Sequence, residues 1–172
     1  MQIAEISLTD YPAAIDGLTE VLHACVHDGA SVNFVLPFPK QEARAFWAGK
    51  VAAAMEGGRR RLWVGRRDGR IVGCVMLDYD LPPNQAHRAE VTKLLVLPEY
   101  RGRGLSKSLM WQLIAAAREM ELRLVTLDTT SGSIAERVYA GVGFKVAGTI
   151  PHFARHPSEN RLEPTTLMYL EM

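Results

Sequence analysis

Residues 91–106 read VTKLLVLPEYRGRGLS, and the organisation of the whole chain follows outward from this segment. Its first half is apolar except for one threonine and one lysine, which is typical of a buried strand. Pro98 ends the strand, and Gly102 and Gly104 come directly before apolar residues that repeat at helical spacing. A glycine turn that opens a helix gathers unpaired backbone N–H groups at the positive end of the helix dipole. The segment therefore predicts a binding site for a pyrophosphate.

Other glycine loops fit this segment less well. A Walker loop needs Gly-Lys-Ser/Thr after its second glycine, whereas this chain has Gly104-Leu105-Ser106. A dinucleotide-binding loop usually follows the first strand of its unit, whereas this one comes after several predicted strands. A Gly-x-Gly turn is also often a plain tight connection, so the rest of the chain has to decide its role.

The segments on both sides predict an α/β (mixed α+β) domain. Strands are expected at residues 3–7, 62–66, 71–79, 89–97, 122–127, 144–149 and 165–169. Helices are expected from a cap at Thr9 or Asp10 to Gly29, and at residues 41–55, 105–120 and 134–142. Asp68-Gly69 is typical of a two-residue hairpin turn. Hairpins come first and strand–helix–strand crossovers later, which predicts a mixed, mostly antiparallel sheet with helices on both faces.

The composition narrows the class of protein. The chain has 172 residues, a formal net charge of +1 and 48% hydrophobic residues, which fits a single domain over residues 1–172. This charge gives no reason to expect a nucleic acid or a membrane as partner, and no apolar run reaches the roughly 18 to 20 residues of a membrane span. The start of the chain lacks the basic and apolar regions of a secretory signal.

The cysteines and histidines give no sign of a disulfide framework or a metal. Cys25 and Cys74 lie in apolar patterns and are interpreted as reduced core residues, although the sequence leaves a disulfide between them open. A cytoplasmic location is therefore expected. His152 and His156 have no carboxylate or thiol partner at metal-ligand spacing, so no metal site is expected.

The glycine segment resembles the acyl-CoA pyrophosphate loop of the GNAT superfamily of N-acetyltransferases, whose pattern is Gln/Arg-x-x-Gly-x-Gly/Ala. Arg101, Gly104 and Ser106 fall on the defined positions, with Ser106 in place of the usual Gly or Ala. Residues 135–144, AERVYAGVGF, are similar to a second superfamily pattern, A-x-x-x-Y-x-x-x-G-F. The resemblance covers about residues 62–169.

This resemblance implies acetyl-CoA as cosubstrate, bound in a V-shaped cleft between the fourth and fifth strands. Backbone groups of the fourth strand would bind the pantetheine arm, and the glycine segment would bind the pyrophosphate. The implied binding residues are Leu95, Val96, Leu97, Arg101, Gly102, Arg103, Gly104, Leu105, Ser106 and Lys107.

The resemblance also implies direct attack of an amine on the bound thioester. Glu90 is the first implied general base and Asp128 the second, directly or through a water, and Tyr139 is the implied general acid for the departing thiolate. Neither cysteine stands in a nucleophile context, so no acyl-enzyme is expected. From the residues alone, Glu90 also fits a solvated strand position, Asp128 a turn cap and Tyr139 a core position.

Further stretches resemble the tabtoxin-resistance acetyltransferases of the same superfamily, which modify a small β-lactam-bearing toxin. Among them are HDGASV at 27–32, RAEV at 88–91 and LDT at 127–129. They imply a small-molecule amine as acceptor and a role in toxin or antibiotic resistance, with Asn33, Phe34 and Trp63 as acceptor contacts. Phe34 and Trp63 fit the core equally well. An acetyltransferase for protein N-termini or lysines, a non-catalytic acyl-CoA sensor and a homodimer all stay open.

Overall fold

The computed structural model describes residues 1–172 and contains one seven-stranded sheet. The strands are β1 (Gln2–Glu5), β2 (Arg60–Arg67), β3 (Arg70–Asp78), β4 (Arg88–Val96), β5 (Leu124–Thr130), β6 (Lys145–Arg155) and β7 (Leu162–Glu171). Their order in the sheet is β1-β2-β3-β4-β5-β7-β6, and all neighbours are antiparallel except β4 and β5. The predicted mixed, mostly antiparallel sheet is therefore confirmed.

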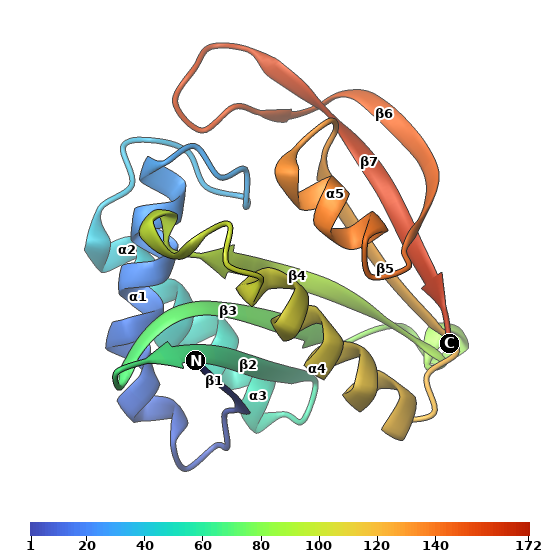
Figure 1. The fold of residues 1–172 in the computed structure, drawn as a ribbon, viewed down its shortest axis with the longest axis horizontal. Coiled ribbons are helices and arrows are strands. Elements are labelled where there is room, and N and C mark those ends of the chain that lie inside the picture. The colour runs from blue at the N-terminus through green and yellow to red at the C-terminus, as the bar shows by residue number, and fades with distance from the viewer.

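Helices cover both faces of the sheet, as predicted. They are α1 (Tyr11–His27), α2 (Lys40–Ala45), the π-helical η1 (Phe46–Val51), α3 (Ala52–Glu56), α4 (Leu105–Glu119) and α5 (Ile134–Ala140), with short 3-10 turns η2 (Pro83–Gln85) and η3 (Pro98–Tyr100). In Figure 1, α4 crosses the front of the sheet and α5 lies over β5, whereas α1, α2 and α3 lie on the opposite face. No helix is both long and apolar enough to cross a membrane.

Two local predictions hold only in part. Asp10 is the N-cap residue of the first helix, as predicted, but its side chain makes no cap hydrogen bond; instead the Ser7 carbonyl accepts the N–H of Tyr11 at 3.0 Å, and the Ser7 hydroxyl accepts that of Asp10 at 3.1 Å. The helix expected at 41–55 contains the π-helical turn η1, which apolar periodicity does not reveal. The hairpin turn at Asp68-Gly69 is confirmed, with φ of 50° and 81°.

The separation of β4 and β5 determines where the main cleft of the protein lies. These parallel strands pair only from Arg88 opposite Leu124 to Glu90 opposite Thr126. Beyond that point β4 stays with β3 and β5 stays with β7, so the sheet opens into a V, visible in Figure 1. Both cysteines are buried free thiols, so the two do not form a disulfide.

Candidate active site

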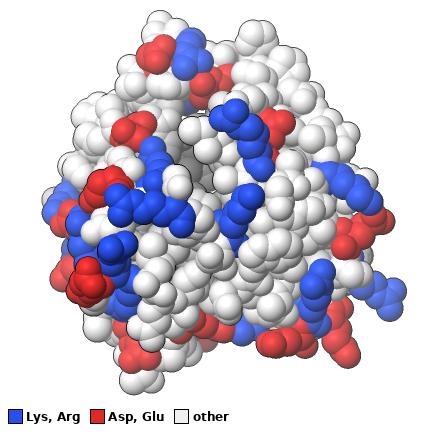
Figure 2. Space-filling model, viewed as in Figure 1, with Lys and Arg blue, Asp and Glu red and all other residues white.

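A cleft of about 810 Å³ lies where β4 and β5 separate. Its walls come from residues 28–33, β4, residues 101–107, β5 and α5, with one residue of β7. Figure 2 shows it as a hollow on the face that carries α4 and α5, with Lys and Arg side chains at its rim. One continuous cavity therefore joins the glycine segment to the acidic and aromatic side chains of β5 and α5.

The glycine segment presents a row of free backbone donors to one end of this cleft. The first hydrogen bond of α4 runs from the Ser108 N–H to the Gly104 carbonyl at 3.1 Å, and the N–H groups of residues 102–107 have no partner in the protein. Gly102 and Gly104 have φ of 71° and 82°, and nothing lies within 4 Å of where a Cβ would stand on either. The glycines thus leave open space in front of donors at the positive end of a helix, which fits the pyrophosphate of a coenzyme A derivative.

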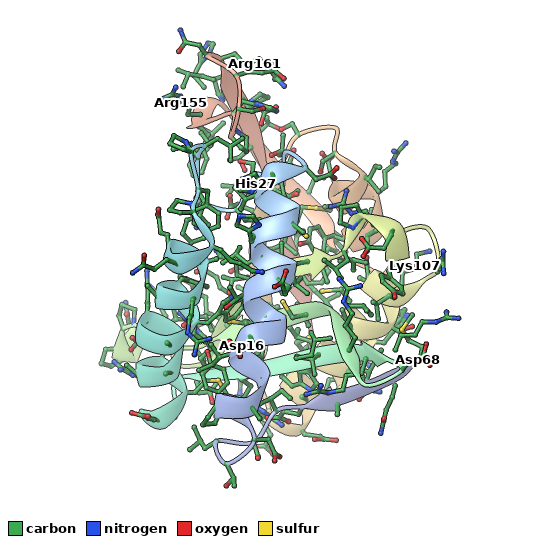
Figure 3. The ribbon with its side chains drawn as sticks, turned by 90° about the vertical axis from the view of Figure 1, so that its left-hand side faces the viewer. Asp16, His27, Asp68, Lys107, Arg155 and Arg161 are labelled. Carbon is green, nitrogen blue, oxygen red and sulfur yellow. The ribbon has the colours of Figure 1, made fainter.

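Packing against the sheet fixes the start of α4. Leu105 is buried, and its side chain occupies the space that a Cβ on Gly65 or Gly73 would need. The absence of a side chain at these two strand glycines lets the helix approach the sheet closely. Lys107, labelled in Figure 3 on the first turn of α4, lines the cleft.

Arg101 uses its guanidinium inside the protein. It forms an ion pair with Asp28 at the end of α1, and its Nε donates to the Val96 carbonyl at 3.0 Å. The Cys25 thiol donates to the same carbonyl at 3.3 Å. Arg101 therefore ties α1, β4 and the glycine segment together, and it leaves the Val96 carbonyl already paired.

Of the predicted cosubstrate-binding residues, most line the cleft and the others lie outside it. Leu95, Val96, Gly102, Gly104, Ser106 and Lys107 line the cleft together with Arg101. Leu97 and Leu105 are buried outside it, and Arg103 lies over the ring of Tyr100 at 5.7 Å.

Asp128 and Tyr139 both line the cleft. Asp128 is exposed on β5 and accepts a hydrogen bond from the Thr165 hydroxyl at 3.2 Å. Tyr139 is 7% exposed on α5, and its hydroxyl has no hydrogen-bond partner in the protein. Burial, and then the charge of Asp128, raises the pKa of Tyr139, so the phenol keeps its proton at neutral pH.

Glu90 lies outside the cleft, in the part of β4 that is still paired with β5. It is opposite Asp78 of β3, and its carboxylate is 3.7 Å from the guanidinium of Arg88. The strands separate only after this residue. This position favours Asp128 over Glu90 as the carboxylate that faces an acceptor.

Of the three predicted acceptor contacts, only one lines the cleft. Asn33 lines the cleft, while Phe34 is half-buried and packs against Phe38 and Phe46. Trp63 is 3% exposed in the core and does not line the cleft, so its placement favours the core interpretation.

Three features near the acceptor side were missed from the sequence. Lys93 lines the cleft from β4, and Glu163 lines it from β7. In addition, the Leu36 N–H donates to the Pro157 carbonyl at 2.8 Å, which joins the loop after α1 to the loop between β6 and β7. Figure 3 shows the hairpin with Arg155 and Arg161 beyond the end of α1 at His27. A lysine inside an apolar strand was the one available signal, whereas the loop contact has none.

The chain also contains no group of three or more His, Cys, Asp or Glu residues arranged to hold a metal ion. The cleft therefore offers backbone donors, the carboxylates of Asp28, Asp128 and Glu163, the phenol of Tyr139 and the lysines Lys93 and Lys107, without a cluster arranged to hold a metal.

Comparisons with known proteins agree with this geometry. The sequence model of the family described as "Acetyltransferase (GNAT) family" matches residues 23–144. An uncharacterized N-acetyltransferase of Mycobacterium tuberculosis is 38% identical over 96 residues, which are 53% of this chain and 56% of that protein. The human N-acetyltransferase 8B is 33% identical over 88 residues, which are 50% of this chain and 39% of that protein. The chain thus spans about half the length of the curated relatives it matches.

Solved structures share the fold at low sequence identity. A ribosomal-protein-alanine N-acetyltransferase of Brucella melitensis has a TM-score of 0.80 at 21% identity, with 100% of both chains covered. A phosphinothricin acetyltransferase of Sinorhizobium meliloti in complex with acetyl-CoA has a TM-score of 0.80 at 16% identity, covering 99% of this chain and 88% of that one. A Salmonella typhimurium protein with its cofactor acetyl-CoA has a TM-score of 0.76 at 22% identity, covering 99% and 93%. By name the first two of these proteins act on different acceptors, so the shared fold leaves the acceptor undetermined.

Proposed function

The chain belongs to the acetyltransferase (GNAT) family, and we propose that the protein transfers the acetyl group of acetyl-CoA to a primary amine of a small molecule by direct attack in a ternary complex. The observation that carries this proposal is the single cleft that joins the free N–H groups of residues 102–107 to Asp128 and Tyr139. An acyl-CoA sensor needs the first part of that cleft and has no use for the second.

The residues of the cleft supply the parts that the reaction requires. Acetyl-CoA, when bound, supplies an acetyl group activated as a thioester. The N–H groups of residues 102–107 and Lys107 hold its pyrophosphate, and the unpaired edge of β4 accompanies its pantetheine arm. Asp128 faces the acceptor amine and accepts a proton from its nitrogen, directly or through a water.

Tyr139 completes the proton balance. The new N–C bond forms as the C–S bond breaks, and the departing sulfur takes the proton of the Tyr139 phenol. A phenol suits this role because it is protonated at neutral pH even at its ordinary pKa of about 10, and burial raises the pKa of Tyr139 further. Proton transfers of this kind typically contribute ~10² to 10⁴ in rate.

A small acceptor is supported by a contact between two loops that extend from opposite arms of the V. The hydrogen bond between the Leu36 N–H and the Pro157 carbonyl joins the loop after α1, whose residues 28–33 form a wall of the cleft, to the loop between β6 and β7. We expect this link between the arms to hinder an extended polypeptide more than a small amine. A role in toxin or antibiotic resistance would follow from such an acceptor.

The proposal is tested by thiol release from acetyl-CoA across an amine panel. The panel holds polyamines, aminoglycosides, amino acids, tabtoxin-like β-lactams and peptides with free N-termini. We expect turnover with one small-molecule class, a fall of about 10²-fold in kcat for Tyr139→Phe, and little change for Tyr169→Phe, since Tyr169 on β7 lies outside the cleft. Turnover of the peptides alone would replace the small acceptor by a protein, and tight acetyl-CoA binding without turnover would favour the sensor.

Two further properties are part of the proposal. Reduced, buried Cys25 and Cys74 suit the cytoplasm. Exposed apolar side chains on β6 and β7 suit a homodimer: Val146, Ile150, Phe153, Leu162 and Leu167. Light scattering should then give twice the chain mass of 19.1 kDa, and a monomer mass would contradict the dimer.

A further inference from the structure

Lys93 is a cation in a place where strands are normally apolar. Its backbone has a φ of 54°, and the β3–β4 register shifts beside it, so β4 bulges at this residue. Its ammonium lies 5.8 Å from the ring centre of Phe34 and 5.4 Å from that of Phe46. Phe46 belongs to the π-helical turn η1, so three separate segments surround this one charge.

No carboxylate of the protein pairs with Lys93. Among the groups that act on its charge, Arg60 and Lys50 are cations, Cys74 is a buried thiol, and Asp128 is the one carboxylate. Arg60 is itself paired with Asp78, and Lys50 forms no ion pair. Burial, followed by Arg60 and Lys50, lowers the pKa of Lys93 to about 8, so the group is still mostly charged at neutral pH.

Lys93 is half-buried. A charge that is largely withdrawn from water is ordinarily paired, because an unpaired one is destabilising. Ring contacts offset part of that cost, at roughly 0.5 to 2 kcal/mol each. The reaction derived above does not use Lys93. A partner that arrives from outside the protein would explain why the charge is kept.

Lys93 and Asp128 stand on the two arms of the V and line the same cleft. We propose that the acceptor is a small amino acid-like molecule, whose amine faces Asp128 and whose carboxylate pairs with Lys93. This inference rests on the proposed acetyltransferase function and narrows its acceptor class. A single lysine is a point charge, so it recognises the carboxylate without imposing a bidentate geometry.

Matched acceptors test the inference. Each amino acid of the panel is compared with its carboxamide and with the decarboxylated amine, both in thiol release and in calorimetric binding to the protein saturated with coenzyme A. We expect the acid to be preferred by about 10-fold or more, mostly in KM, because the charge-assisted contact contributes to binding. Lys93→Met should bring the preference close to one, and Lys93→Arg should restore part of it.

Lys145→Met is the control, since Lys145 is exposed on β6 and pairs with Glu171. Acetyl-CoA affinity should stay unchanged in both methionine variants, which shows that the fold is retained. Equal treatment of acids and carboxamides by the wild-type protein would overturn the inference while leaving the acetyltransferase function intact. A loss of kcat for every amine in Lys93→Met, with no change in preference, would overturn it too, because Lys93 would then act in proton transfer. Selective binding of acids without any thiol release would support the carboxylate contact at Lys93 but refute the proposed function, and the bound acid would then not be an acceptor.

Discussion

The two ends of the cleft are built from different parts of the chain. The phosphate end consists of backbone N–H groups from one continuous segment, residues 102–107. The acceptor end consists of side chains from four separate segments: Asn33, Lys93, Asp128 and Tyr139. A backbone site depends on conformation and tolerates many side chains, whereas a side-chain site changes with every substitution. This difference explains how one fold can keep its cosubstrate and still serve unrelated acceptors.

The largest effect is expected at the acceptor end, from the two candidate carboxylates, of which the sequence analysis placed Glu90 first and Asp128 second. Asp128→Asn should lower kcat by about 10³-fold, within the range of a lost general base. Glu90→Gln should change it by less than about 3-fold, because Glu90 stands outside the cleft beside Arg88. Steady-state kinetics with the acceptor found in the panel measures both variants.

The amide in Asp128→Asn keeps an oxygen for the Thr165 hydroxyl, so the local hydrogen bond is preserved. Thermal unfolding should therefore stay close to that of the wild-type protein. A larger loss of kcat in Glu90→Gln than in Asp128→Asn would contradict the description of the acceptor end, because the catalytic carboxylate would then lie outside the cleft.

A smaller effect is expected at the phosphate end, where acetyl-CoA binding should weaken in addition to the loss of stability that backbone strain causes. Gly104→Val puts a β-branched residue at a φ of 82°, which costs about 1 to 2 kcal/mol and turns a donor away from the ligand. The Kd for acetyl-CoA should rise about 10-fold. Gly69→Val is the matched control, because Gly69 has a φ of 81° in the β2–β3 turn and does not line the cleft.

Both valine variants should lose similar stability in urea unfolding, since both carry the same backbone strain. Only Gly104→Val should weaken acetyl-CoA binding in calorimetry. Equal affinity in the two variants would mean that the glycine conformation does not form the phosphate site.

These two ends were also unequally predictable from the sequence. The phosphate end lies in one segment, so its glycines and the following helix pattern were sufficient to predict it. The alternation of apolar and polar residues could not reveal where β4 and β5 separate. The position of this separation leaves Glu90 outside the cleft and Asp128 in its lining. Trp63 illustrates the same limit, because an aromatic residue in a strand has the same pattern in a core and in a pocket.

Contacts between distant segments were the least predictable. Arg101 was expected to bind phosphate by its charge, but Asp28 and the Val96 carbonyl hold its guanidinium. Lys93 interrupts an apolar strand, yet its ring neighbours come from residues far away in the sequence. Only the folded chain brings such groups together, and neither periodicity nor motif spacing encodes them.

The smallest effect concerns the free energy of unfolding, and it is expected only at the acceptor end. Lys93→Met should stabilise the protein at pH 7 by roughly 1 kcal/mol, because the pKa of Lys93 drops from 10.5 to about 8 on folding and the charged form is disfavoured there. The full linkage effect is larger, but removing the ammonium also removes its attraction to the two phenylalanine rings, which offsets part of the gain. Between pH 8 and 10.5 the unfolded wild-type chain binds a proton that the folded one has released, so wild-type stability rises relative to the variant.

The gap between Lys93→Met and the wild-type protein should therefore narrow as the pH rises from 7 to 9.5 in urea unfolding. Other titrating groups are common to both proteins and cancel in this difference. No comparable gain is expected at the phosphate end, where the free N–H groups carry no buried charge. If the difference in the free energy of unfolding stayed constant across this pH range, folding would not lower the pKa of Lys93. The charge of Lys93 would then not reduce the stability of the protein.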